Sequence, residues 1–308
     1  MEAGELQTVN GAVLVVGGGV GGIQAALDLA ETGFYVYLVE KQPALGGHMA
    51  QLDKTFPTGD CAMCTLAPRL VECGRHPNIK VMTCAEIREV RGVPGDFRVR
   101  VRLFARYVDV GKCKGCGDCA AACPIEAVDD FNAGLGRRKA IYRLYAQSFP
   151  HAYALDMDTC LECDECTDAC AAGAIEPMMW DKEVVLRVGA IILSTGYGLF
   201  DPGILSEYGH GVYPNVLTSI QVERMLSASG PSHGKLIRPS DGLEPQKIAF
   251  LQCVGSRDVA RGQEYCSAVC CMQATKQGIV AKEHIPGLDV AIFMLDVRAF
   301  GKDFERYY

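Results

Sequence analysis

The residues best suited to chemistry in this sequence are cysteines, which number 16 in 308 positions. Eight of them form two runs with the same spacing, C-x2-C-x2-C-x3-C. The first run consists of Cys113, Cys116, Cys119 and Cys123, and the second of Cys160, Cys163, Cys166 and Cys170. This spacing is typical of [4Fe–4S] cluster ligands, because two-residue spacers let one loop supply three thiolates to one cubane. We therefore predict two [4Fe–4S] clusters.

The two-cluster pattern also predicts which cysteine serves which cluster. In bacterial ferredoxins the fourth cysteine of each run binds the cluster of the other run. We therefore expect Cys170 to complete the first cluster and Cys123 to complete the second. Zinc suits this pattern less well, because zinc sites usually pair two C-x2-C units across a longer loop. The runs differ in that Pro124 follows the first and Ala171 follows the second.

The other cysteines leave several interpretations open. Four lie close together near the end of the chain: Cys253, Cys266, Cys270 and Cys271. Their spacing suits a further cluster and buried apolar cysteines equally well. Cys61 and Cys64 form one C-x2-C motif, which could be a redox pair, part of a ligand set, or packing. Cys73 and Cys84 follow no pattern, and we expect them to pack.

A glycine-rich motif near the N-terminus predicts a dinucleotide site. Residues 12–39 read as strand, helix and strand, with Gly17, Gly19 and Gly22 in a G-x-G-x-x-G motif. The first glycine forms the tight turn, the second lets the pyrophosphate approach the backbone, and the third lets helix and strand pack closely. Glu40, about 20 residues further on, can accept the ribose hydroxyls. We expect Glu40 and the neighbouring Lys41 to bind the nucleotide.

Two further segments favour FAD over NAD as this nucleotide. Gly47 belongs to the segment LGGH (45–48), which is similar to the second glycine pair that flavoproteins often carry after the acidic residue. Thr195 and Gly196 end an apolar strand. This strand is similar to the strand-then-ATG segment that returns to the flavin in flavoproteins with two dinucleotide domains, with Ser194 replacing alanine. We therefore expect Gly47, Thr195 and Gly196 to contact FAD.

The order of these segments predicts that the cysteine runs are inserted into the nucleotide-binding domain. Residues 97–103 alternate between apolar and arginine positions, as in a half-exposed strand, and strand character resumes at Glu183. We expect an α/β fold, a Rossmann-like FAD-binding domain with an inserted two-cluster ferredoxin domain of α+β type. The expected boundaries are 1–106 and 182–246 for the FAD-binding domain, 107–181 for the insert, and 247–308 for the start of a second dinucleotide-type domain.

The composition narrows the class of protein. The net charge of −7 and the isoelectric point near 5.4 offer no basic surface for nucleic acid. No apolar run is long enough to span a bilayer, and the acidic N-terminus is unlike a signal peptide. We therefore expect a cytoplasmic protein. Between the cysteine runs, the basic and aromatic residues 137–153 suit either a docking surface or a packed connection.

Together, these motifs resemble the A subunit of heterodisulfide reductase, the HdrA-like family of iron–sulfur flavoproteins. The resemblance covers nearly the whole chain and is carried by VVGGGVGG, LGGHMAQLDKTFPT, KCKGCGDCAAACP, FLQCVGSRD and YCSAVCCMQATKQ. It implies an FAD-binding fold of thioredoxin-reductase type and a third [4Fe–4S] cluster on the last four cysteines. It also implies partners: other subunits of a heterodisulfide-reductase-like complex, with a ferredoxin, hydrogenase or dehydrogenase as electron donor.

The expected function is therefore electron transfer between FAD and [4Fe–4S] clusters. In the family this resembles flavin-based bifurcation, with the disulfide reduced on a partner subunit, and no side chain is expected to be catalytic. Two alternatives stay open. One is an NAD(P)H-dependent flavoprotein similar to glutamate synthase small subunits, and the other is a flavin-free electron carrier or scaffold. Because the sequence stops inside what the family would make its second dinucleotide domain, we expect a fragment or a split subunit.

Overall fold

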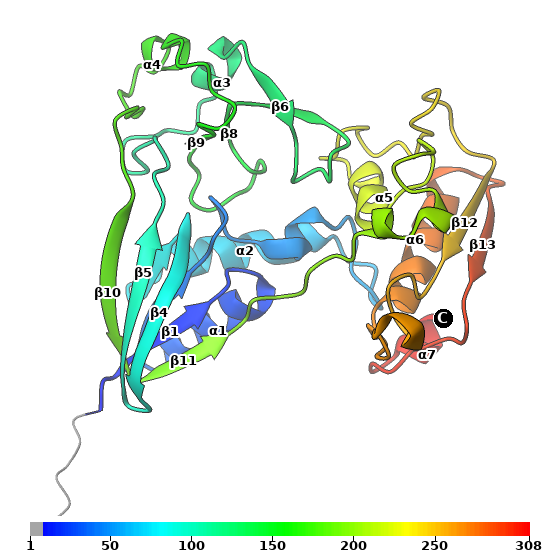
Figure 1. Cartoon of the computed structure of the whole chain (residues 1–308), viewed down its shortest axis with the longest axis horizontal. Coiled ribbons are helices and arrows are strands. Elements are labelled where there is room, and N and C mark those ends of the chain that lie inside the picture. The colour runs from blue at the N-terminus through cyan, green and yellow to red at the C-terminus, as the bar shows by residue number, and fades with distance from the viewer. Residues whose placement is uncertain (1–8) are drawn as a thin grey trace, which may run out of the picture. The chain divides into compact units, whose positions relative to one another are not determined.

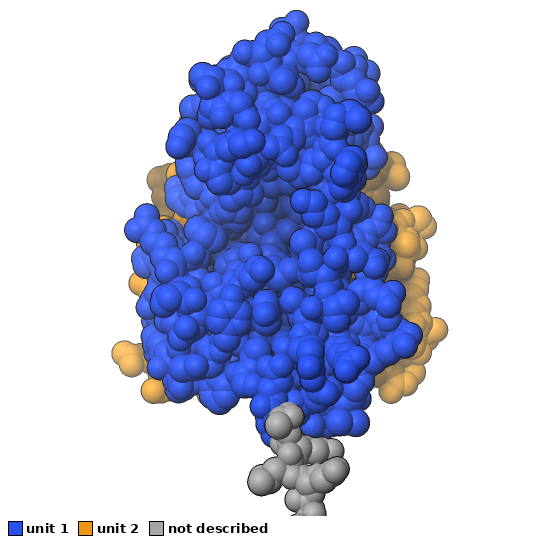
Figure 2. Space-filling view, turned by 90° about the vertical axis from the view of Figure 1, so that its left-hand side faces the viewer, with its two compact units in different colours: residues 1–50, 65–128, 137–196 blue, residues 51–64, 129–136, 197–308 orange. Residues whose placement is uncertain are grey.

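The chain forms two compact units in the computed structural model, which describes residues 9–308. Unit 1 runs to Ala50 and continues with Thr65–Val128 and Arg137–Gly196. Unit 2 comprises Gln51–Cys64, Asp129–Gly136 and Tyr197–Tyr308 (Figure 2). The boundaries expected from the sequence, at residues 107, 182 and 247, stay a prediction. No helix within residues 9–308 is both long and apolar enough to cross a membrane.

Unit 1 is built on a four-stranded parallel sheet with the strand order β11-β1-β2-β3 (Figure 1). Its strands are β1 (Ala12–Val16), β2 (Tyr35–Val39), β3 (Ile79–Met82) and β11 (Ala190–Leu193). Helix α1 (Val20–Glu31) joins β1 to β2 and buries Ile23, Ala26 and Leu27. Helix α2 (Ala62–Arg75) precedes β3. The predicted α/β fold and its strand–helix–strand unit within residues 12–39 are confirmed.

A three-stranded antiparallel sheet completes the core of this part of unit 1. It has the order β10-β5-β4, formed by β4 (Ala85–Val93), β5 (Asp96–Leu103) and β10 (Lys182–Val188). In β5 the side chains of Val99 and Val101 are buried, while Arg98 and Arg100, which alternate with them, are exposed. The predicted period of two is therefore confirmed. The buried valines pack in one hydrophobic cluster with Leu14 and Val39 of the parallel sheet.

The apolar segment after Glu183 is two strands rather than one. β10 pairs antiparallel with β5, and β11 pairs parallel with β1. The chain passes between the two sheets at Gly189, where a Cβ atom would lie 2.1 Å from the carbonyl oxygen of Asn10. Only glycine fits so close a backbone approach, and this change of sheet returns the chain to the end of β1.

The cysteine runs occupy the insert between β5 and β10. The insert contains α3 (Asp118–Ala122), β6 (Glu126–Val128), β7 (Arg137–Lys139), β8 (Ile141–Tyr142), β9 (Ala154–Leu155) and α4 (Glu165–Asp168). Figure 1 shows α3 and α4 beyond the ends of β5 and β10. Ala140, Ile141 and Ala174 form a small core with Cys119 and Cys123. Two of the predicted cluster ligands are therefore part of the hydrophobic core of the insert.

Unit 2 contains a β-α-β unit of its own. Strands β12 (Lys247–Leu251) and β13 (Asp289–Phe293) pair in parallel and are joined by helix α6 (Cys270–His284). Its other elements are α5 (Ser219–Leu226), α7 (Phe304–Tyr307) and the short 3-10 helices η2 (Pro202–Ile204), η3 (Ser206–Tyr208) and η4 (Val259–Arg261). A fourth 3-10 helix, η1 (Gly47–Gln51), spans the first boundary between the units.

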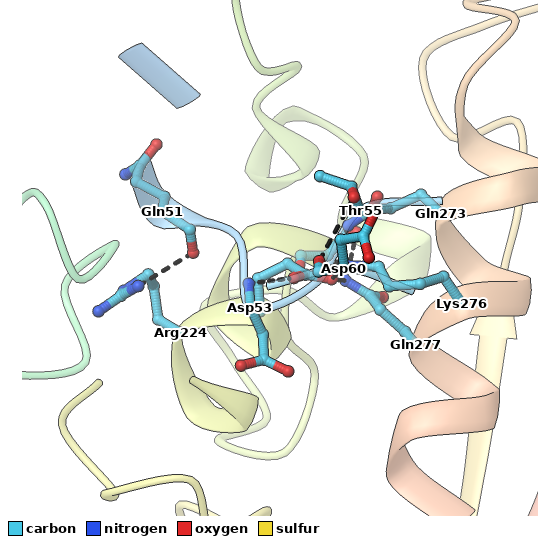
Figure 3. Close-up of polar contacts among 10 residues, drawn as sticks. Gln51, Asp53, Thr55, Asp60, Arg224, Gln273, Lys276 and Gln277 are labelled. Atoms are coloured by element: carbon cyan, nitrogen blue, oxygen red, sulfur yellow. Dashed lines mark hydrogen bonds and ion pairs between the residues drawn. The ribbon is translucent and has the colours of Figure 1, made fainter. Parts of the chain in front are cut away.

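Two neighbouring residues of α5 hold the separate pieces of unit 2 together. The Glu223 carboxylate accepts a hydrogen bond from the backbone N–H of Asp53 at 3.0 Å. Arg224 donates to the carbonyl oxygen of Gln51 at 3.0 Å (Figure 3). It also donates to the side-chain oxygen of Asn132 at 2.9 Å. Long-range polar contacts therefore fix segments 51–64 and 129–136 within unit 2, although both are remote from α5 in the sequence.

The Glu223 carboxylate also forms a fully buried ion pair with Lys276 of α6. The Lys276 and Glu223 side chains are 1% and 0% exposed, respectively. Gln273 and Gln277 donate further hydrogen bonds to the same carboxylate at 2.6 and 2.8 Å (Figure 3). Burial lowers the pKa of Lys276, and the Glu223 charge opposes that shift. The charge of each partner is therefore tolerated only because the other is present.

Candidate functional site

Four cysteines from both runs line one cavity in the insert. They are Cys113, Cys116, Cys119 and Cys170, and Val108, Lys114 and Tyr153 also line the cavity. Burial raises the pKa of Cys119 to about 12, and the other three thiols add to the rise. The fourth cysteine of the second run therefore lies with the first three cysteines of the first run. This is the grouping that the crossover prediction requires.

Three of the remaining cysteines of the runs, Cys123, Cys160 and Cys166, show the reciprocal grouping. Burial raises the pKa of Cys166, and the thiols of Cys160 and Cys123 contribute to the rise. Cys123, from the first run, therefore lies near thiols of the second. Thiols gathered in this way suit a metal group that binds thiolates, which releases their protons on binding.

The two loops repeat the same backbone conformation. Gly115 and Gly117 have φ values of 68° and 102° in the first loop, and Glu162 and Asp164 have 52° and 61° at the matching places in the second. Left-handed conformations are uncommon outside glycine and cluster at functional loops. The N–H of Glu162 points at the Cys160 sulfur, 3.3 Å away. Such turns aim backbone amides at the cluster sulfurs, which is one means of setting a cluster's reduction potential.

A third group of four cysteines lines a cavity in unit 2. The volume of this cavity, including the part that is open to solvent, is about 300 Å³. The group consists of Cys253, Cys266, Cys270 and Cys271. Cys253 follows β12, and Cys270 and Cys271 begin α6. Burial raises the pKa of Cys270, and the other three thiols contribute. Of the two open interpretations of these cysteines, simple packing does not explain why all four face one space.

The third group shares its local geometry with the ferredoxin-type loops. Ala268 has a φ of 58° and its N–H points at the sulfur of Cys266, two residues earlier, at 3.3 Å. Glu162 and Cys160 show the same relation in the insert. Within residues 9–308, no three His, Cys, Asp or Glu side chains are placed to bind one metal ion together. A [4Fe–4S] cluster does not require that arrangement, because each thiolate binds a different iron atom.

Positive charge lies beside the third group. Arg257 and Arg298 line the same cavity and both pair with Asp296, Arg298 at 3.0 Å. The hydrogen bond and charge of Asp296 raise the pKa of Arg298 further. Two guanidinium groups at this cavity suit a bound group of net negative charge, such as a cluster held by four thiolates.

The glycine-rich loop of unit 1 has the geometry of a dinucleotide cradle. A Cβ atom on Gly17 would lie 2.2 Å from the carbonyl oxygen of Ser194, and one on Gly22 would lie 1.8 Å from the carbonyl oxygen of Gly17. Helix, loop and returning strand are therefore in backbone contact. This contact places Thr195 and Gly196, both exposed, directly beyond the loop. The strand that was expected to return to the flavin does return to this loop.

Glu40 lies at the edge of the same loop. Its side chain is buried, and its carboxylate accepts hydrogen bonds from the N–H of Gly18 at 2.7 Å and of Gln42 at 2.8 Å. Both bonds hold the carboxylate beside the N-terminus of α1, where ribose hydroxyls are bound in this type of fold. Lys41, the next residue, is exposed.

The second glycine pair packs against the first. The N–H of Gly46 donates to the carbonyl oxygen of Gly18 at 2.8 Å, and a Cβ atom on Gly47 would lie 2.9 Å from the Cα of Gly19. On Gly19 itself, the nearest atom to a Cβ would be 3.9 Å away. Open space therefore borders Gly19, on the side where a pyrophosphate would approach. The residues fit a bound FAD.

We expect the Gly19→Ala variant to fold but to bind FAD on the order of tenfold more weakly, or worse. Gly19 has an ordinary extended backbone, φ −78° and ψ −178°, so alanine fits the chain, while its methyl group occupies the open space. Gly21→Ala is the matched control, because a Cβ there meets nothing within 4 Å. Flavin fluorescence titration measures both affinities. Equal affinities would contradict this site.

A buried arginine links the insert to the flavin loop, although no motif in the sequence indicated it. Arg106 is 7% exposed and donates to the carbonyl oxygen of Tyr153 at 2.9 Å, to that of Pro43, and to the hydroxyl of Thr83 at 2.9 Å. Burial lowers the pKa of Arg106. One side chain thus joins the insert to the two segments that follow β2 and β3.

The segment between the cysteine runs is a packed connection within unit 1. The hydroxyl of Tyr145 donates to the carbonyl oxygen of Leu45, and the N–H of Leu45 donates to the carbonyl oxygen of Phe149 at 2.8 Å. The Phe149 ring fills the space that a side chain on Gly74 would need. Of the two open interpretations of this segment, the packed connection fits these contacts. It holds the insert directly against the second glycine pair.

The four cysteines outside the three groups are two free thiols and one bonded pair. Cys73 is fully buried and burial raises its pKa to about 12, as expected of packing. Cys84 is half-buried, and burial raises its pKa as well. Cys61 and Cys64 are joined to each other by a disulfide. The C-x2-C motif is therefore a bonded pair in this structure.

Comparison with known proteins agrees with the predicted FAD-binding and two-cluster segments. Residues 112–175 match the model of a 4Fe–4S dicluster domain, and residues 12–63 match that of FAD-dependent oxidoreductases. The iron–sulfur A subunit of CoB–CoM heterodisulfide reductase from Methanocaldococcus jannaschii is 50% identical over 97% of this chain. The corresponding A subunit numbered 2 from Methanopyrus kandleri is 53% identical over 96%. The chain belongs to the HdrA family of heterodisulfide reductase subunits.

Membership of this family confirms the resemblance found in the sequence. A third member is 48% identical over 98% of this chain, the A subunit of the H2:CoB–CoM heterodisulfide,ferredoxin reductase from Methanothermobacter marburgensis. This chain spans less than half the length of these three relatives, 45–46% of each. The family models support FAD and two [4Fe–4S] clusters. They do not reach the third group of cysteines, which begins beyond residue 175.

Proposed function

We propose that this chain is an electron-transferring subunit of a heterodisulfide-reductase-like enzyme. The observation that carries the proposal is that one chain holds a dinucleotide cradle, two cavities lined by four cysteines each, and a further group of Cys123, Cys160 and Cys166. When bound, FAD exchanges electrons in pairs or singly, and each [4Fe–4S] cluster exchanges one. A chain that holds both kinds of group can join two-electron and one-electron chemistry.

The protein's own residues contribute binding and placement in this proposal. Gly17, Gly19 and Gly22 shape the cradle with Gly47, Thr195 and Gly196, while Glu40 and Lys41 bind the ribose side of FAD. Each [4Fe–4S] cluster is bound by four cysteines. The first is bound by Cys113, Cys116, Cys119 and Cys170, the second by Cys160, Cys163, Cys166 and Cys123, and the third by Cys253, Cys266, Cys270 and Cys271. Arg106 and Tyr145 hold the insert against the flavin loop. These contacts keep the distance between the flavin and the clusters of the insert fixed, so that electrons can pass directly from one to the other.

The family gives this proposal its finer form. The relatives' names combine heterodisulfide with H2 and ferredoxin. We propose that this chain likewise works beside other subunits, which carry the disulfide site and pass electrons from such a donor. Flavin-based bifurcation would then occur at the FAD of this chain. The β12–α6–β13 unit carries cysteines rather than G-x-G-x-x-G at its first turn, so direct NAD(P)H reduction is less favoured.

Stepwise anaerobic reduction with dithionite tests the proposal. We expect about five electrons per chain, two for one flavin and one for each of three clusters, with flavin absorbance and cluster EPR signals changing in one titration. Iron without flavin would instead support the scaffold alternative. Bleaching of the flavin by NADH or NADPH alone would support the NAD(P)H-dependent alternative.

The third cluster has a separate test, the Cys270→Ala variant. We expect iron to fall from about twelve to about eight atoms per chain, with flavin unchanged, because only the unit 2 group loses a ligand. Cys84→Ala is the matched control, since Cys84 lines neither four-cysteine cavity. Iron and acid-labile sulfide analysis reads both variants. Wild-type protein with about eight irons would contradict the third cluster.

A further inference from the structure

One pair of cysteines stands apart from the cluster groups. Cys61 and Cys64 are joined by a disulfide, whereas the other fourteen cysteines of the chain are free thiols in this structure. Both side chains of the pair are exposed. Buried thiols such as Cys73 are shielded from reagents in solution, and this pair is not.

The disulfide adds little to the fold around it. A bond between residues three apart closes a very short loop, so it removes little freedom from the unfolded chain. Segment 51–64 is already fixed without it. The N–H of Thr55 donates to the carbonyl oxygen of Asp60 at 2.9 Å, the N–H of Ala62 donates to that of Asp53 at 3.0 Å, and Asp53 is bonded to α5. A structural role therefore does not account for the pair.

The local geometry favours one sulfur as a thiolate. Cys61 lies directly before the first residue of α2, a helix of 14 residues. The N–H of Cys64, in the first turn, donates to the Cys61 sulfur at 3.1 Å. An N–H donor and the positive end of a helix both stabilise a negative charge, and C-x2-C motifs with such a thiolate are the reactive ones.

We propose that Cys61 and Cys64 form a reversible dithiol–disulfide couple that exchanges an electron pair with dithiols from solution. The thiolate of the incoming dithiol attacks the Cys64 sulfur, the Cys61–Cys64 bond breaks, and Cys61 leaves as the stabilised thiolate. The second thiol of the reductant then closes its own disulfide and releases Cys64. One disulfide is reduced and one dithiol is oxidised, and the protons of the reductant pass to the solvent or to the two protein thiols.

A thiol-trapping experiment on the full, anaerobically purified chain tests this proposal. The protein is equilibrated with graded ratios of reduced and oxidised dithiothreitol, then alkylated and digested with trypsin. The peptide Thr55–Arg69 contains Cys61 and Cys64 and no other cysteine. We expect it to pass from no label to two labels in a single step. A parallel series with a reduced protein dithiol, thioredoxin, distinguishes a protein partner from a small molecule.

Variants separate this couple from a ligand role. In Cys61→Ser we expect Cys64 to be labelled at every ratio, with iron and flavin per chain unchanged. The peptide with the buried Cys73 serves as the internal control and should stay unlabelled in the native protein. Two labels at every ratio would overturn the couple. Loss of about four irons in Cys61→Ser would overturn it too, because the pair would then belong to a cluster. Neither result depends on the electron-transfer proposal, which the wild-type iron and flavin contents test separately.

Discussion

The Lys276→Met variant should lose about 3–5 kcal/mol of unfolding free energy. The substitution leaves the Glu223 carboxylate fully buried without its counter-charge, although Gln273, Gln277 and the N–H of Asp53 still donate to it. Hydrogen bonds alone do not repay the desolvation of a carboxylate. Urea denaturation followed by circular dichroism measures the loss.

Lys54→Met provides the matched control for this prediction. The same substitution there breaks a pair with Glu283 at 3.0 Å, in which the two side chains are 35% and 55% exposed. Exposed pairs contribute about 0–1 kcal/mol, so this variant should be nearly as stable as the wild type. If Lys276→Met were no less stable than Lys54→Met, the buried pair would not be what holds α5 against α6.

The Cys170→Ala variant should lose the same cluster EPR signal as Cys113→Ala. The two residues belong to different runs, yet they line one cavity with Cys116 and Cys119. We expect each variant to lose about four irons per chain, because a cubane needs all four thiolates. EPR spectra of the dithionite-reduced variants identify which cluster is missing.

The reciprocal pair completes this test. Cys123→Ala and Cys166→Ala should both lose the other signal of the insert, because Cys123 lies with the second run. Cys84→Ala should keep every signal. If Cys170→Ala instead lost the signal that Cys166→Ala loses, each run would bind its own cluster and the crossover would be wrong.

The cysteine and glycine motifs could be found from the sequence because their chemistry depends on local spacing. Gly17, Gly19 and Gly22 act within one turn, and three cysteines of each run lie on one loop. The change of sheet at Gly189 was not visible, because β10 and β11 read as one apolar strand. Only the backbone approach to Asn10 reveals why the chain turns there.

Contacts between residues that are distant in the chain could not be predicted from the sequence, for a different reason. Arg106 follows a strand and Tyr145 lies in the basic, aromatic segment 137–153; neither belongs to a motif, and their partners lie far away in the chain. Glu223 and Lys276 are charged residues that would be expected at a surface, and only the folded unit shows them fully buried. The third cysteine group was left open for the same reason, since its spacing alone does not bring Cys253 to α6.

The most direct test of the central claim is the ratio of iron, sulfide and flavin in a single anaerobic preparation of this chain. We predict about twelve irons, about twelve sulfides and one FAD per chain, with only the FAD affinity reduced in Gly19→Ala. Iron without flavin in the wild-type protein, or flavin without iron, would contradict the claim that one chain joins the two kinds of electron carrier.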